Sequence, residues 1–136
     1  MQVFPAGVRP SVRANPDYFT GTVWQDPIIS AEPPARLLAL SVHFAPGART
    51  AWHTHPLGQT LRVVDGAGLV CLRDGSPTVI RPGDTVWIPA GAEHWHGATP
   101  QNAMTHIAMQ ETEDGSAATW LEPVSDADYN KEPARG

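Results

Sequence analysis

Proline and glycine interrupt this sequence at such short intervals that it has no room for a long helix. The chain contains 14 prolines and 12 glycines among its 136 residues, and most of the runs between them are short. Several of these runs alternate apolar and polar residues or are rich in β-branched and aromatic residues, which is typical of β-strands. The pattern predicts about ten short strands joined by turns, and therefore an all-β sandwich or barrel.

The clearest strand signal covers residues 37–45. A strand directs every second side chain to the same face. Four bulky apolar residues here share one face, namely Leu38, Leu40, Val42 and Phe44. We expect this face to point inward and His43, which has the opposite parity, to point outward. Residues 102–111 form a second long strand, but both of its faces are apolar enough to be internal.

Shorter strands are expected between the turn residues, at 18–24, 59–64, 67–73, 78–81, 85–89 and 119–121. The dipeptide Asp65-Gly66 is a strong hairpin signal. Residues 25–36 contain three prolines and are predicted to form an extended loop. Ser125 is a candidate N-cap for one helical turn at residues 126–130.

One compact domain is expected, because 136 residues with 41% hydrophobic content can bury a single core. We expect an arm at residues 1–17, a barrel at 18–122 and a tail at 123–136 whose last residues fray. The net charge is -5 and Lys and Arg do not cluster, so nucleic acid is not an expected partner. No signal peptide or membrane-spanning run is recognisable, which predicts a cytoplasmic protein, and Cys71 is expected to be buried.

Two pairs of histidines sit at strand-like spacing and carry the strongest functional signal. His53 and His55 are two residues apart, so an extended strand would project both to one face. A short turn can bring the amide of Gln59 toward the same point, and His94 and His96 repeat the spacing on another strand. Burying such imidazoles without a metal would require many hydrogen-bond partners. The spacing therefore predicts a metal site inside the barrel.

Residues 47–98 resemble the two sequence motifs of the cupin superfamily. The first motif corresponds to Gly47, His53, His55, Gln59 and Gly66, and the second to Gly83, Pro89, Gly91 and His94. The resemblance implies a single-domain cupin, which is a jelly-roll barrel or double-stranded β-helix. Two positions depart from the usual pattern, because Gln59 replaces a ligand glutamate and Ala98 replaces an asparagine. A neutral amide leaves a divalent metal its full charge, which favours Lewis-acid activation of a substrate at fixed oxidation state.

A closer resemblance is to the bacterial cupin-type hydroxynitrile lyases. It is carried by residues 46–61, 82–84, 94–98 and 103–106, with further similarity at 19–23 and near Trp120. It implies reversible cleavage of an aromatic (R)-cyanohydrin, such as mandelonitrile, to an aldehyde and hydrogen cyanide. It also implies a manganese(II) centre held by His53, His55, Gln59 and His94. Iron, nickel, cobalt and zinc suit the same ligands and are alternatives.

The same resemblance implies further site residues. They are Thr50, His96, His106 and Gln110 beside the metal, with Leu40 and Val42 lining the substrate pocket. One group must take the hydroxyl proton and one must protonate cyanide, and neutral imidazoles suit both tasks near about pH 7. We expect His106 to carry the proton as first choice and His96 as second. Thr50 and Gln110 are expected to orient the substrate by hydrogen bonds.

Two other functions fit the same residues. One is a cupin oxygenase, isomerase or decarboxylase acting on a small aromatic or keto compound, since the fold alone does not specify the reaction. The other is a metal-binding or small-molecule-binding cupin without turnover, which the additional polar residues beside the metal disfavour. The expected partner is a small-molecule substrate. The proline-rich arm and five tryptophans indicate that barrels associate into a homodimer or homotetramer.

Overall fold

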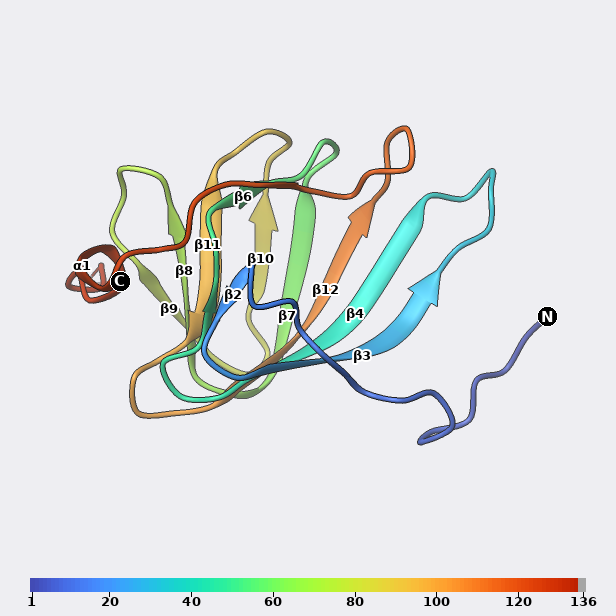
Figure 1. Ribbon diagram of the computed structural model, residues 1–136, viewed down its shortest axis with the longest axis horizontal. Helices are drawn as coiled ribbons and strands as arrows, with labels where there is room; N and C mark the ends of the chain where they lie inside the picture. Colours follow the sequence, from blue (N-terminus) through green and yellow to red (C-terminus); the bar gives the residue numbers. More distant parts are fainter. Residues whose placement is uncertain (135–136) are drawn as a thin grey trace.

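The computed structural model describes residues 1–134, which form strands and one short helix (Figure 1). Thirteen strands build two antiparallel sheets, so the all-β prediction is confirmed. The first sheet contains, in spatial order, β1 (Val12–Arg13), β3 (Val23–Ser30), β4 (Leu37–Phe44), β12 (Met104–Glu111), β7 (Gln59–Gly66) and β10 (Thr85–Ile88). The second contains β13 (Thr119–Trp120), β6 (His53–Thr54), β11 (His94–Ala98), β5 (Arg49–Thr50) and β2 (Phe19–Thr20), with β8 (Gly68–Leu72) beside β11 and β9 (Thr78–Ile80) beside β8.

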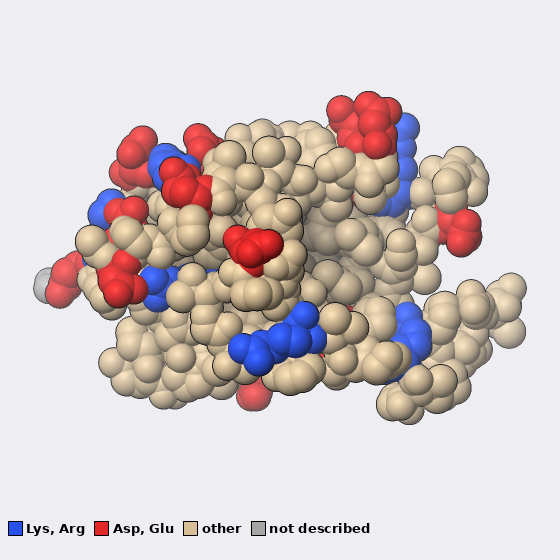
Figure 2. All heavy atoms as spheres, in the orientation of Figure 1, with Lys and Arg blue, Asp and Glu red and all other residues tan. Residues whose placement is uncertain are grey.

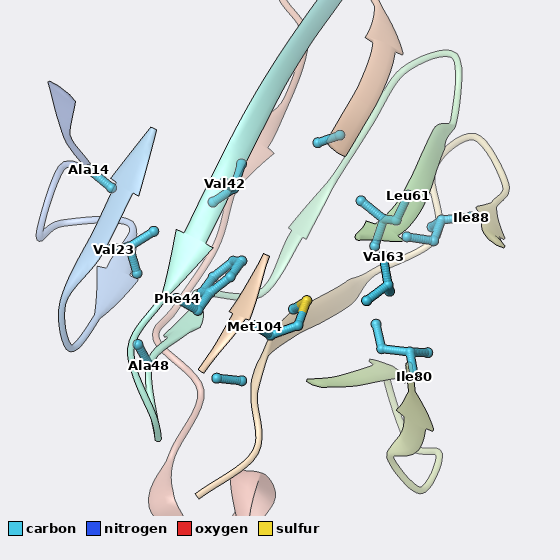
Figure 3. Close-up of a cluster of buried hydrophobic side chains, with 12 residues drawn as sticks. Ala14, Val23, Val42, Phe44, Ala48, Leu61, Val63, Ile80, Ile88 and Met104 are labelled. Carbon is cyan, nitrogen blue, oxygen red and sulfur yellow. The ribbon is translucent and has the colours of Figure 1, made fainter. Parts of the chain in front are cut away.

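Apolar side chains of both sheets meet in a core between them, as Figure 3 shows. Val42 and Phe44 of β4 are buried there, as the alternation predicted. His43 points outward, where its ring bonds to Asp26 and Thr105. In β12 the even-numbered residues are the buried ones, namely Met104, His106, Ala108 and Gln110. The inner face of this strand therefore carries two polar side chains into the interior of the barrel.

The hairpin prediction at Asp65-Gly66 is wrong, because the chain crosses here from one sheet to the other. β7 pairs with β12 and β10, whereas β8 pairs with β11 and β9. Gly66 has φ +80°, and a Cβ on it would lie 1.9 Å from the carbonyl oxygen of Ala103. The dipeptide predicts a turn, but it does not predict which strands pair, because the partners of β7 and β8 are distant in sequence. The predicted strand at 18–24 is likewise divided at Gly21 between β2 and β3, which belong to different sheets.

The predicted loop at 25–36 is also wrong in its first half, because β3 continues through Pro27 to its last residue, Ser30. Proline lacks a backbone donor and is normally confined to edges and bulges of sheets. β1 covers β3 only at Trp24 and Gln25, so the outer edge at Pro27 has no partner strand. The register with β4 also shifts just after Pro27. An edge with a bulge tolerates the proline that the sequence suggested would end the strand.

Both ends of the described chain pack on the barrel. The arm contributes β1 to the first sheet, and α1 (Asp126–Tyr129) begins at Ser125, whose side chain accepts a hydrogen bond as the predicted N-cap. The hydroxyl of Tyr129 donates to the carbonyl oxygen of Ala98 at 2.6 Å. Arg49 is buried, and its guanidinium packs against the helix, 4.4 Å from the centre of the Tyr129 ring. These contacts pack the helix on the outer face of the second sheet, where Tyr129 joins Trp95, Leu69 and Cys71 in a second buried cluster.

The tail contacts the rest of the protein as far as Ala134, although the sequence predicted that its last residues fray. The amide of Ala134 donates to the carbonyl oxygen of Pro77 at 2.7 Å, and residues 135–136 lie outside the described part of the chain. Cys71 is buried, as expected. On the face in Figure 2, the Lys and Arg side chains lie apart from one another and form no continuous basic surface. No helix within residues 1–134 is long and apolar enough to cross a bilayer.

We predict that Gly66→Ala lowers the free energy of unfolding by at least about 3 kcal/mol, because both the backbone conformation and the Ala103 carbonyl oppose a side chain. Gly83→Ala is the matched control, since Gly83 has φ +92° but no atom within 4 Å of an added Cβ. Only the conformational cost of about 1 kcal/mol applies there. Urea unfolding of the two variants measures the difference. Equal losses would contradict the crowded crossover at Gly66.

Candidate metal centre and substrate cavity

A cavity of about 380 Å³ lies between the sheets and holds most of the predicted site residues. Its polar wall consists of Thr50, His53, His55, Gln59, His96 and Gln110. Its apolar wall consists of Phe19, Leu38, Leu40, Val42, Ala108 and Trp120. Gln25 and the small residues 115–118 complete the lining, and no Asp, Glu, Lys or Arg within the described chain belongs to it. Leu40 and Val42 therefore line the cavity, as the resemblance implied.

Three imidazoles are held in a defined tautomer by backbone carbonyl groups. His53 and His94 each donate from Nδ1 to the carbonyl oxygen two residues earlier, at 2.9 Å in both cases. His55 donates from Nδ1 to the carbonyl oxygen of Ala117 at 2.7 Å. A carbonyl oxygen can only accept, so the proton of each neutral ring resides on Nδ1 and Nε2 keeps its lone pair. This is the arrangement that metal-binding histidines adopt in proteins.

The same imidazoles lie close together around His53. The ring centre of His53 is 4.1 Å from that of His94, 4.9 Å from that of His55 and 5.2 Å from that of His96. Among the described residues, His53, His94 and His96 form a group that could hold a metal, because their ligand atoms lie within 4.8 Å of one another. His55 is not part of that group, although its Nε2 is buried with no hydrogen-bond partner among the described residues. An unpartnered buried lone pair is what a metal ligand would leave in the absence of its ion.

Gln59 adds an amide oxygen beside these imidazoles, and Gln110 orients it. The Nε2 amide of Gln59 donates to Oε1 of Gln110 at 2.9 Å, which turns Oε1 of Gln59 toward Nε2 of His94 at 3.2 Å. Since the proton of His94 is on Nδ1, this contact brings two lone pairs together with no hydrogen between them. A cation bound by both atoms relieves that repulsion. The residues present therefore fit a divalent metal, and Gln110 contacts a metal-ligand candidate in addition to lining the cavity.

His96 and His106 form a buried pair behind the polar wall. Nε2 of His106 lies 2.9 Å from Nδ1 of His96, so one ring donates to the other. His96 lines the cavity, whereas His106 is fully buried and does not. Parity correctly placed His106 on the inner face of β12, but it could not show that His96 stands between His106 and the cavity. Thr50 also lines the cavity, and its hydroxyl oxygen accepts from the backbone amide of His96 at 3.2 Å.

Burial keeps these imidazoles neutral. Desolvation is the main cause that lowers the pKa of His94 and of His106 to about 4. Burial and the neighbouring imidazoles also hold the pKa values of His53 and His96 well below the ordinary value of 6.5. Neutral rings have the free lone pairs that metal binding requires. The cluster therefore offers neutral candidate ligands beside a cavity that no charged side chain of the described chain lines.

Sequence reasoning missed two aromatic residues of the cavity wall, Phe19 and Trp120. The indole of Trp120 stacks on the imidazole of His53, with ring centres 4.6 Å apart and an angle of 27° between the planes. Its other face stacks on Tyr18 at 4.8 Å. The ring of His53 is thus fixed by stacking as well as by its Nδ1 hydrogen bond. In the sequence, Trp120 belonged to a predicted short strand and to the region of family resemblance, and neither observation predicted this contact.

Comparison with known proteins places this site in a family. The model of the cupin domain matches residues 40–108. The chain belongs to the cupin family. The (R)-mandelonitrile lyase of Granulicella tundricola is 50% identical over 131 residues, which cover 96% of this chain and 100% of that protein.

Solved structures show the same cupin fold. A cupin-like protein of Thermotoga maritima superposes with a TM-score of 0.82 at 34% identity, covering 95% of each chain. The polyketide cyclase RemF of Streptomyces resistomycificus superposes with a TM-score of 0.75 at 17% identity, covering 95% of this cupin and 90% of that chain. At 17% identity, the similarity to RemF concerns the fold alone. The predicted single-domain cupin architecture is confirmed.

We predict that the metal-free protein loses stability as the pH falls from about 6.5 toward about 4. Histidines whose pKa is lowered by folding bind protons more readily in the unfolded chain, so their stabilising effect is full above pH 6.5 and is lost on acidification through the folded pKa of about 4. Between about pH 6.5 and 5 the carboxylates stay ionised and the histidines dominate. Chemical unfolding across this range measures the effect, and a flat profile would contradict it. His106→Gln should reduce the slope.

We also predict that Trp120→Leu weakens metal binding by roughly tenfold, the lower range for residues that orient a metal ligand. Trp120→Phe keeps an aromatic face on His53 and should bind metal nearly as well as the native protein. Trp87→Leu is the matched control, because Trp87 is 62% exposed and lies outside the cavity. Calorimetric titration of the metal-free proteins with manganese(II) gives the dissociation constants. Equal affinities for the native protein and Trp120→Leu would show that the stack does not hold His53.

Proposed function

We propose that this cupin is a metal-dependent hydroxynitrile lyase, which reversibly cleaves an aromatic (R)-cyanohydrin such as mandelonitrile to an aldehyde and hydrogen cyanide. The observation that carries the proposal is the cavity itself, where a cluster of neutral imidazoles faces an apolar wall large enough for an aryl group. The 50% identity to an (R)-mandelonitrile lyase along almost the whole chain supports the same reaction.

The proposed metal ligands are His53, His55, His94 and Gln59. His53, His55 and His94 are the imidazoles whose Nδ1 is bound to a backbone carbonyl, and Gln59 contributes the oxygen that Gln110 directs inward. We propose manganese(II) as the resident ion. When bound, the ion supplies a Lewis acid that polarises the substrate oxygen and stabilises negative charge on it. Four neutral ligands leave the ion its full charge, which suits this task.

His96 is the proposed proton carrier, in place of the first choice made from the sequence. Its Nε2 is buried without a partner and the residue lines the cavity, whereas His106 stands behind it. With His96 Nδ1 donating to His106, Nε2 can take the hydroxyl proton of the cyanohydrin. The electrons of the carbon–carbon bond leave with cyanide, and the same proton then returns from His96 to give hydrogen cyanide. His106 acts as a positioning residue that fixes the tautomer of His96.

The remaining walls bind the substrate and exclude water. The aliphatic side chains of β4, together with Phe19 and the edge of Trp120, are available to pack against an aryl ring. Thr50 accepts a backbone hydrogen bond, so its own hydroxyl hydrogen is free to donate to the substrate. Apolar surroundings strengthen both the hydrogen bond and the electrostatic stabilisation of charge on the substrate oxygen.

The proposal is tested by loading metal-free protein with manganese(II) and following benzaldehyde release from mandelonitrile. Release above the metal-free control, with one enantiomer consumed preferentially, is expected. Absence of release with metal bound would refute the lyase assignment. Oxygen uptake or decarboxylation with small keto compounds under the same conditions would support the alternative cupin activities instead.

Two histidine variants should separate metal binding from proton transfer. We predict that His55→Ala loses both metal and activity, whereas His96→Ala retains metal and loses at least about a hundredfold in kcat, the usual effect of removing a general acid–base. Metal content by mass spectrometry, measured beside kcat, distinguishes the two outcomes. His43→Ala is the control, because His43 lies on the outer face of the sheet. Loss of metal in His96→Ala would instead place His96 in the ligand set.

A further inference from the structure

Gln25 is a polar residue at a place where the fold calls for an apolar one. It follows Val23 by two residues on β3, so both share the inner face, and Val23 is fully buried. Its register partner on β4 is Val42, another buried apolar residue. Gln25 is partly buried and lines the cavity, and none of the side-chain hydrogen bonds found in residues 1–134 involves it.

The register of the first sheet separates Gln25 from Gln59, the candidate ligand that this sheet carries. One row of paired residues on the inner face runs from Gln59 through Gln110 to Leu38. Another runs from His106 through Val42 to Gln25. Gln25 therefore lies on β3, three strands away from the β7 strand that carries Gln59, and two rows further along the inner face. The apolar residues of β4 lie between Gln59 and Gln25.

We propose that Gln25 determines substrate specificity by hydrogen bonding to a hydroxyl group on the aromatic ring of the substrate. Ligand cavities are mostly apolar, and the few polar groups in them fix the orientation of the ligand. An amide can donate to and accept from a hydroxyl group, which matches the unpaired side chain of Gln25. A charged substituent would lack a counter-charge, because no charged residue among those described lines the cavity.

This inference rests on the proposed function for its choice of an aromatic aldehyde, which is the product half that carries the ring. With the reacting oxygen at the histidine centre, the ring lies along Leu40 and Val42 and its far edge faces β3. A substituent on that edge is the part of the ligand that Gln25 can reach. The substrate class is therefore a ring-hydroxylated aromatic cyanohydrin.

Binding of two ligands of the same size tests the proposal without turnover. 4-Hydroxybenzaldehyde and 4-methylbenzaldehyde are titrated into the metal-loaded and the metal-free protein, and dissociation constants are obtained by NMR or calorimetry. The native protein should prefer the hydroxyl compound by about tenfold, the effect of one hydrogen bond to a neutral group. Gln25→Leu should abolish or reverse that preference, and Gln25→Met serves as a second apolar variant if Gln25→Leu folds poorly.

Gln101→Leu is the matched control, because it removes an exposed amide that does not line the cavity. Its preference should equal that of the native protein. No preference in the native protein, or a preference that survives in both Gln25 variants, would overturn the proposal. Since this measurement needs no cleavage, a failed lyase assay with intact hydroxyl preference would refute the reaction and not the role of Gln25. Where cleavage occurs, the ratio of kcat/KM for the two corresponding cyanohydrins should shift in the same direction.

Discussion

Hydrogen bonds from imidazole Nδ1 atoms to backbone carbonyl groups govern what the interior of this barrel can do. His53 and His94 use the carbonyl oxygen two residues earlier, which an extended chain places beside the ring, and His55 uses a carbonyl from a distant segment. Each bond fixes a tautomer and directs a lone pair inward. Without these bonds the same buried rings would be unsatisfied polar groups that destabilise the fold. With them, the strands that build the core also build a ligand set.

The two sheets contribute different side chains to this centre. The second sheet supplies His53 from β6 and His94 and His96 from β11, and His55 directly follows β6. The first sheet supplies Gln59, His106, Gln110 and the aliphatic side chains of β4. Every second side chain of β4 and β12 points inward. At one end of these strands the inward side chains belong to the apolar core, and at the other end they line the cavity. The reactive end and the apolar end of the cavity are thus fixed by register and need no mobile element to assemble them.

The alternation in β4 and the turns between short strands predicted the fold class. Most residues predicted for the site line one cavity, whereas His94 and His106 are buried outside its lining. Local signals failed where a distant partner decides the outcome. Asp65-Gly66 specified a turn, yet β12 and β11 determine that the adjoining strands belong to different sheets. Pro27 is tolerated because β1 leaves the edge of β3 uncovered there. The alternation of side chains along β12 predicted that His106 faces inward, but not that it lies behind His96 as seen from the cavity. Trp120 and Gln25 lie outside residues 40–108, which the family model matches.

The carbonyl of Ala117, which accepts the hydrogen bond from His55 Nδ1, belongs to residues 115–118, which form part of the cavity wall. This wall segment carries small side chains and is joined to the barrel interior through a ring that is also a metal-ligand candidate. Coupling between two sites is reciprocal. An ion that immobilises His55 also restrains the segment, and a segment held in place favours the His55 orientation that binds the ion. Ion binding at His55 would therefore be coupled to the position of residues 115–118.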